Sequence, residues 1–267
     1  MSNTDQIAAA LSIDALGSDA RVGFDLAANA GYSGIAFATS HPELTPDALG
    51  QSARRHLRTI LSTKNLSIDS LRIAVPRLSL ADPSTIDRAM DNARRGILLA
   101  QDLGIKTVSL NIGNLTDSKT PQSTIAAALR ELAQHADAGG LSLAVGSETF
   151  SLLPALLKSV DYGPAKAHMD TARLIAESAD PLKMAEEAGA NDYASIGQLT
   201  AADAIRAGSS LRAAPLGEGQ VPFQQLLHIL HEQNFSGPTV VDLRDLSNPS
   251  ESAEHAARIL GPLLQRK

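Results

Sequence analysis

Two patterns of apolar residues alternate along this chain. Short segments that are mostly apolar, such as Leu141–Val145 and Thr239–Leu243, are separated by longer segments whose apolar residues recur every three or four positions. The first pattern is typical of buried strands and the second of amphipathic helices. The helical pattern is clearest after Pro83, where apolar residues stand at positions 86, 90, 93, 97 and 100. The pattern therefore predicts an alternation of strands and helices.

This alternation gives eight predicted strands, each followed by a helix. The predicted strands are Ala8–Asp14, Ile35–Thr39, Ile68–Val75, Lys106–Ile112, Leu141–Val145, Ala165–Asp170, Ile196–Thr200 and Thr239–Leu243. The predicted helices are one capped by Ser18 or Asp19 with Val22, Leu26 and Ala30 on its apolar face, Pro46–Lys64, one from Pro83 to Leu103, Pro121–Asp137, Leu152–Val160, Pro181–Ala188, one from Phe223 to Asn234, and Ser250–Leu264. The segment between Ala201 and Leu216 is irregular, and no element is predicted there.

The connections between the predicted strands are too long for hairpins, which implies parallel strands joined by helices. Eight such units in 267 residues predict an α/β fold, a single (β/α)8 TIM barrel that spans residues 1–267 as one domain. An open, doubly wound sheet is the alternative. The first strand is not followed by a G-x-G-x-x-G turn, which disfavours that alternative.

Composition narrows the classes of function. A net charge of −6 and an aromatic content of 3% disfavour nucleic-acid binding, and we expect no membrane partner because no apolar run is long enough to span a bilayer. The absence of cysteine excludes disulfides, thiolate catalysis and cysteine-ligated zinc. The N-terminus lacks a basic segment followed by an apolar one, so a cytoplasmic location is the default expectation.

The segment Leu216–Asp245 carries the most specific signals. Gly217 and Gly219 flank an acidic turn that larger side chains would crowd, and a helix with one apolar face follows. The last predicted strand is apolar until it reaches Asp242, and Arg244 follows closely. In parallel α/β folds the functional groups gather at the carboxyl ends of the strands.

This segment resembles the last helix–strand unit of the xylose isomerase-like barrel family of sugar isomerases and epimerases. Further segments are similar to other parts of that family, and they are Gly31–Phe37, Leu99–Gly113, Glu131–Val145 and Met169–Pro181. The resemblance implies a barrel that binds a small carbohydrate-like molecule at its mouth. Dimers are usual in the resembled family, which leaves a homodimer open.

The resemblance also implies a divalent cation held by Glu, Asp, His and Glu on strands five to eight. The matching positions here are Gly146, Asp170, a residue at or near Gln198, with Gly197 as the alternative, and Asp242. Two of the four ligands are thus missing. Glu148 has the same strand parity as Gly146, so an all-oxygen shell of Glu148, Asp170, Gln198 and Asp242 is one hypothesis, and it would suit Mn²⁺ or Mg²⁺. The other hypothesis is that no metal binds.

Candidate residues follow from both hypotheses. Asp170, Asp242 and Glu148 are the candidate catalytic residues, and the candidates for substrate binding are Arg173, Gln198, Arg212, Asn111 and His41. Without a metal, Arg173, Arg212 and Arg244 would neutralise the acids or bind an anionic substrate. Among other candidates, His168 shares the strand parity of Asp170 and should form hydrogen bonds inside the barrel.

Three functions are compatible with these observations. The first is an isomerase or epimerase of a sugar or sugar derivative with a rearranged active site. The second is a metal-free, non-catalytic barrel that binds a carbohydrate-like or anionic ligand. The third, a DNA-repair nuclease, would need a histidine-rich metal cluster and a basic groove, and this acidic sequence has neither.

Overall fold

The computed structural model describes residues 6–74, 77–190 and 194–264. The strands are β1 (Ile7–Ser12), β2 (Tyr32–Ala38), β3 (Ser67–Ile73), β4 (Thr107–Asn111), β5 (Ser142–Gly146), β6 (Ala165–Asp170), β7 (Ile196–Ala201), β8 (Asp203–Ala207), β9 (Ser210–Ala214) and β10 (Thr239–Val241). The α-helices are α1 (Ala20–Asn29), α2 (Gln51–Thr63), α3 (Ile86–Leu103), α4 (Gln122–Ala138), α5 (Leu153–Val160), α6 (Thr171–Ala176), α7 (Pro181–Gly189), α8 (Phe223–Glu232) and α9 (Pro249–Leu260), and one 3₁₀ turn spans Phe150–Leu152.

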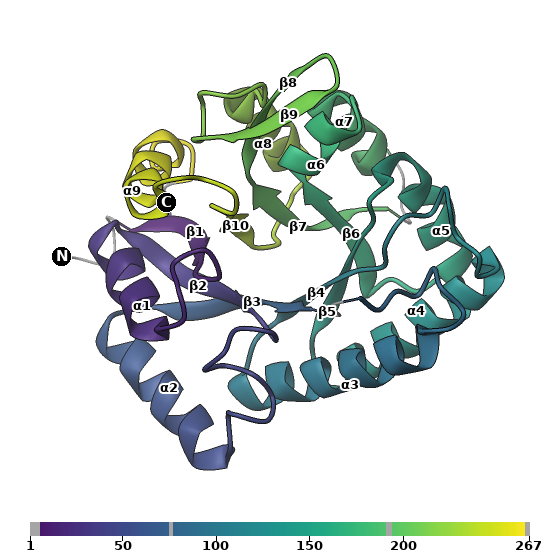
Figure 1. Ribbon diagram of the computed structural model, residues 1–267, viewed down its shortest axis with the longest axis horizontal. Helices are drawn as coiled ribbons and strands as arrows, with labels where there is room; N and C mark the ends of the chain where they lie inside the picture. The colour runs from purple at the N-terminus through teal and green to yellow at the C-terminus, as the bar shows by residue number, and fades with distance from the viewer. Residues whose placement is uncertain (1–5, 75–76, 191–193, 265–267) are drawn as a thin grey trace.

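Eight parallel strands close into a barrel in the order β1-β10-β7-β6-β5-β4-β3-β2. The helices surround the barrel on its outside (Figure 1). The predicted (β/α)8 TIM barrel is therefore confirmed, and all eight predicted strands have a counterpart in it. Val75, the expected end of the third strand, lies outside the described residues. No helix within the described residues is both long and apolar enough to cross a bilayer.

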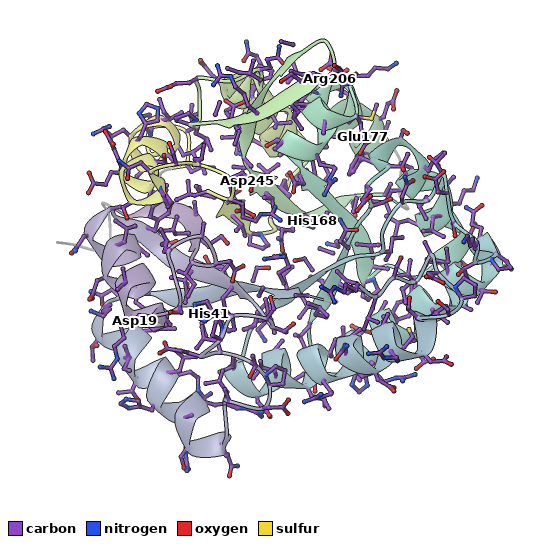
Figure 2. All side chains as sticks on the ribbon, in the orientation of Figure 1. Asp19, His41, His168, Glu177, Arg206 and Asp245 are labelled. Atoms are coloured by element: carbon purple, nitrogen blue, oxygen red, sulfur yellow. The ribbon has the colours of Figure 1, made fainter. Side chains whose placement is uncertain are left out.

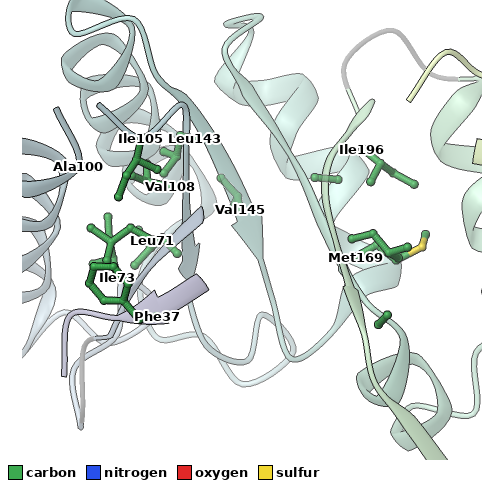
Figure 3. Close-up of a cluster of buried hydrophobic side chains, with 14 of the residues drawn as sticks. Phe37, Leu71, Ile73, Ala100, Ile105, Val108, Leu143, Val145, Met169 and Ile196 are labelled. Atoms are coloured by element: carbon green, nitrogen blue, oxygen red, sulfur yellow. The ribbon is translucent and has the colours of Figure 1, made fainter. Parts of the chain in front are cut away.

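Successive side chains of each barrel strand point alternately outward, toward the helices, and inward, into the barrel. Side chains such as Leu71, Val108 and Leu143 point outward and pack beneath the helices in the main core, where all three are fully buried (Figure 3). The barrel interior is instead lined by small and polar side chains, with a small separate cluster of Ala10, Ala36 and Val240. Because these interior side chains are small, polar side chains have room nearer the carboxyl ends of the strands.

The first helix differs from the prediction in the face that it buries. Val22 is 50% exposed, whereas Ala20, Gly23, Phe24 and Ala27 are buried. A Cβ on Gly23 would overlap Ile13, so a close approach to the barrel sets the helix orientation. The predicted cap is confirmed at Asp19, whose side chain accepts a hydrogen bond from the Arg21 backbone N–H.

Two regions contain elements that the prediction lacks. The short helix α6 directly follows β6, and an antiparallel hairpin of β8 and β9 occupies the segment described above as irregular. The hairpin lies outside the barrel sheet, on the side of α6, α7 and α8 (Figure 1). Both elements contribute residues to the cavity at the barrel mouth.

Candidate active site

Two aspartates at the carboxyl ends of the barrel strands share one arginine. Asp170 is the last residue of β6, and Asp242 directly follows β10. The Nε atom of Arg244 lies 2.5 Å from Oδ2 of Asp242, and its Nη2 atom lies 3.4 Å from Oδ2 of Asp170. The guanidinium thus bridges the two carboxylates, and the structure brings the two predicted acids together at the barrel mouth.

Backbone groups hold both carboxylates in place. Oδ1 of Asp242 accepts a hydrogen bond from the Arg244 backbone N–H at 3.0 Å. Oδ1 of Asp170 accepts one from the Arg173 backbone N–H at 3.1 Å, so that Asp170 caps α6. Each acid therefore has one oxygen fixed by the main chain and one that faces the guanidinium.

The environment shifts the pKa values of this cluster. Burial raises the pKa of Asp242 above its ordinary value, and the neighbouring Arg244 guanidinium only partly opposes that effect. Burial alone would lower the pKa of Arg244, but the charges of Asp242 and Asp170 outweigh it, and the net shift is upward. Arg244 therefore remains charged, and Asp242 is a stronger base than an exposed aspartate.

A chain of polar side chains crosses the barrel interior below this pair. Nε2 of His168 lies 2.7 Å from Oγ1 of Thr200 and 3.4 Å from Nε2 of Gln198. The Ser70 hydroxyl donates to Oε1 of Gln198 at 2.6 Å. Burial lowers the pKa of His168 to about 4, so its imidazole is neutral at pH 7. The expected inward, hydrogen-bonded position of His168 is confirmed, and Figure 2 shows it near the middle of the ring of strands.

Strand register decides which residue of β7 stands at the level of Asp170. His168 pairs with Gln198, and Asp170 pairs with Thr200. Gln198 is therefore one layer below the mouth, where it is buried in the polar chain. Thr200 occupies the position beside Asp170 that the sequence comparison gave to Gln198 or Gly197.

A cavity of about 480 Å³ opens next to the aspartates. It is bounded by α6, the β8–β9 hairpin and the segment after β10, and among its lining residues are Asp170, Arg173, Arg212, Asp242 and Arg244. A second cavity of about 20 Å³, the size of one water molecule, adjoins it because Asp170 and Arg173 line both. Asn111, Gly146 and His168 are further lining residues of the smaller cavity.

Three of the predicted site residues line neither cavity, and Gln198 in the buried polar chain is one of them. Glu148 is exposed in the loop after β5, because the strand ends at Gly146 and its alternation does not continue to residue 148. His41 is buried in the loop after β2, with Nδ1 accepting from the Glu43 backbone N–H at 3.4 Å. The structure therefore gathers Asn111, Asp170, Arg173, Arg212 and Asp242 around the two cavities, but neither Glu148 nor His41.

Asp203 is a buried acid that the sequence reasoning missed. Its carboxylate accepts four backbone N–H bonds, from Ala204, Gly217, Gly219 and Val221, at 2.9 to 3.1 Å. Gly217 has a positive φ of 81°, and a Cβ on Gly219 would overlap the carboxylate. The two glycines therefore allow the backbone of this turn to pack closely around the Asp203 carboxylate. A lone acid in an apolar run, upstream of a two-glycine turn, is the signal that could have revealed it.

Polar contacts also fix the cavity wall formed by the hairpin. The Arg206 guanidinium donates to the Ala176 carbonyl at the end of α6, and Arg206 exchanges two hydrogen bonds with Gln220 through its own backbone. Both Glu177 carboxylate oxygens accept from the Phe150 backbone N–H, at 3.0 and 3.1 Å. Figure 2 shows Arg206 and Glu177 on the same side of the barrel, near the hairpin and α6.

Comparison with known proteins identifies the family. The family model described as Xylose isomerase-like TIM barrel matches residues 24–263. The chain belongs to the xylose isomerase-like TIM barrel family. No curated protein sequence matches the chain. Eight similar solved structures share 14–19% sequence identity with this chain, so the similarity to them is at the level of the fold.

Three solved structures illustrate this similarity. A xylose isomerase domain protein from Planctomyces limnophilus has a TM-score of 0.80 at 18% identity, covering 96% of this chain and 95% of its own. A xylose isomerase-like TIM barrel protein from Mycobacterium smegmatis, in complex with magnesium, has a TM-score of 0.75 at 19% identity, with 99% and 100% covered. D-Psicose 3-epimerase from Clostridium cellulolyticum H10, with D-tagatose, has a TM-score of 0.74 at 14% identity, with 96% and 100% covered.

Proposed function

We propose that this chain is an isomerase or epimerase of a sugar or sugar derivative that acts at the barrel mouth without a divalent cation. Family membership supports the reaction class, since the structural neighbours include D-psicose 3-epimerase and L-ribulose 3-epimerase. The observation that carries the proposal is the Asp242–Arg244 pair in the 480 Å³ cavity. It combines a base of raised pKa with a fixed positive charge.

The side chains present at the mouth do not fit a metal ion. Gly146 offers no ligand, and Glu148 lies outside both cavities. Among the described residues, no three His, Asp or Glu side chains are grouped closely enough to hold a metal ion. The two remaining acids already bind the Arg244 guanidinium. We therefore assign to Arg244 the neutralising role that a cation would otherwise perform.

This arrangement suits proton transfer next to a carbonyl group. The Asp242 carboxylate would remove the proton from the carbon beside the carbonyl. The electron pair of the broken C–H bond would form a C=C bond, and the π pair of the carbonyl group would move to its oxygen. Arg244 retains free N–H donors, because the aspartates occupy only part of its fork, and its side chain is 43% exposed. These donors would stabilise the resulting oxyanion. Return of the proton from Asp242 to the former carbonyl carbon, while the proton of the adjacent hydroxyl passes to the former carbonyl oxygen, would complete an isomerisation. An epimerisation would instead take a proton from solvent on the opposite face of the same carbon.

A second candidate function is supported by the same contact. Because Arg244 satisfies both carboxylates, the pair is also stable without any reaction to perform. A barrel of this kind would bind a carbohydrate-like ligand in the cavity without converting it. The two functions differ in one measurable property, which is the exchange of a carbon-bound proton with solvent.

Proton exchange in D₂O tests the proposal. The protein is dialysed against EDTA and incubated with D-fructose, D-ribulose, hydroxypyruvate or D-ribulose 5-phosphate, and ¹H NMR follows the proton on the carbon beside the carbonyl. We expect deuterium incorporation into at least one of these compounds. Asp242→Asn should abolish it, and Glu254→Gln, on the exposed face of α9, should retain it. Exchange that requires added Mn²⁺, or that survives Asp242→Asn, would contradict the proposal, and exchange with none of the compounds would favour the binding function.

A further inference from the structure

We infer that the ligand of the 480 Å³ cavity carries an anionic group, a carboxylate or a phosphate, that binds between Arg173 and Arg212. This inference rests on the proposed function for the location of the reacting carbon, and it adds the substrate class. It follows from the distribution of charge around the cavity, which separates into two walls.

Arg173 and Arg212 form one wall. Arg173 is in α6 and Arg212 is on β9 of the hairpin, and both line the cavity. Within the described part of the chain, neither takes part in an ion pair. This differs from Arg244 on the other side, which is bound to two carboxylates. Glu177 is close enough to Arg173 for the guanidinium to lower the pKa of its carboxyl, but both Glu177 oxygens accept from the Phe150 backbone N–H. Two guanidinium groups on one wall, neither of them in an ion pair within the described residues, are a site for the oxygens of an anion.

The acids around the cavity do not neutralise this wall. Asp203 directs its carboxylate at four backbone N–H groups, and Asp170 and Asp242 share Arg244. Asp245 is exposed at the rim after β10, on the same side as Asp242. Asp242 and Asp245 therefore lie on the segment after β10, whereas Arg173 and Arg212 lie on α6 and β9. Asp170 and Asp203 lie next to the two arginines in the fold, but Arg244 and backbone N–H groups occupy their carboxylates. A polyol with one anionic end matches this division, with its hydroxyl and carbonyl groups near the acids.

The space between the walls suits a carbon skeleton. Six alanines are among the residues that line the cavity, and they are Ala172, Ala176, Ala202, Ala204, Ala213 and Ala214. Their methyl groups leave the volume open and offer apolar contact to the ligand. The hairpin that carries Arg212 is held to α6 by the Arg206–Ala176 hydrogen bond, so the two arginines are attached to one rigid wall. A volume of 480 Å³ is within the range of small-molecule sites.

Paired probes, one anionic and one neutral in each pair, test this inference. Isothermal titration calorimetry on the EDTA-dialysed full-length protein compares D-gluconate with D-glucose and D-ribose 5-phosphate with D-ribose. We expect at least one anion to bind about tenfold more tightly than its neutral partner, and added salt to reduce that preference. The first pair reports on a carboxylate and the second on a phosphate. Arg173→Gln and Arg212→Gln should each weaken binding of the preferred anion by about tenfold, because each removes a charge-assisted contact.

Arg55→Gln is the matched control, since Arg55 is exposed on α2, away from the cavity. It should leave the anion preference unchanged, and circular dichroism confirms that each variant is folded. The inference is overturned if neither anion binds better than its neutral partner, or if both cavity variants keep the full preference. A protein that prefers an anion but exchanges no proton in D₂O would overturn the proposed catalysis and leave this inference standing.

Discussion

Asp203 offers the sharpest test of how the cavity wall is built. Its side chain is 3% exposed and accepts backbone N–H bonds from Gly217, Gly219 and Val221 across the chain, in addition to its neighbour Ala204. Hydrogen bonds to a charged group contribute about 1.5–3 kcal/mol each, and partial hydration of the emptied site returns some of this. Asp203→Ala should therefore lower the free energy of unfolding by about 3–6 kcal/mol.

Urea denaturation followed by circular dichroism measures this loss. Asp203→Asn should lose less, about 2–4 kcal/mol, because one oxygen remains while the new amide N–H₂ group opposes backbone donors. The exposed Asp245→Asn should change the free energy by no more than about 0.5 kcal/mol. A loss below about 1 kcal/mol for Asp203→Ala would refute the reasoning.

A double-mutant cycle of Gly219 and Asp203 tests the same packing. A Cβ on Gly219 would overlap the Asp203 carboxylate, so Gly219→Ala alone should be destabilising. Its cost should fall by about 1 kcal/mol or more in the Asp203→Ala background, because the obstructing carboxylate is then absent. Simple additivity of the two changes would contradict the packing described here.

Two further predictions concern the barrel mouth. A Cβ on Gly146 would stand 3.2 Å from Nδ1 of His168, so Gly146→Ala should cost about 1 kcal/mol and Gly146→Glu clearly more, as thermal melting would show. The pKa of Asp242 is raised in the folded state, so the native protein binds this proton more tightly than the unfolded chain does, and the associated stability is lost as pH rises through the folded pKa. Urea denaturation between about pH 4 and pH 7 should therefore show this loss in the wild type and a smaller one in Asp242→Asn, whereas an identical pH dependence would contradict the burial argument.

The sequence predicted the barrel well because apolar patterning dominates its strands and longer helices. The strand of Ala165–Asp170 was placed with its observed bounds. The second strand begins at Tyr32 instead of Ile35, because the serine and glycine that follow Tyr32 are residues typical of turns. The buried face of helix α1 was predicted wrongly for a related reason. Apart from Phe24, its buried side is made of alanine and glycine, which pack closely but give a weak periodic signal.

The short helix α6 and the two strands of the hairpin were missed. Helix α6 has only six residues, too few for periodicity, and the strand Ser210–Ala214 exposes its first three residues. The pairing of Asp170 with Thr200 could not be read from the sequence, because a shift of two residues along a strand keeps the same parity. The acids Asp170 and Asp242 were found because the resemblance to the family matches its ligand positions on strands six and eight to these two residues.

In the proposed site, Arg244 is the positive charge that joins Asp170 and Asp242. Titration of the EDTA-dialysed protein with Mn²⁺, followed by calorimetry and by the melting temperature, tests this most directly. We expect no stoichiometric binding and no rise in melting temperature for the wild type, whereas Arg244→Leu should melt at a lower temperature and recover part of the loss when Mn²⁺ is added. Stoichiometric Mn²⁺ binding by the wild type that disappears in Asp170→Ala would contradict the account.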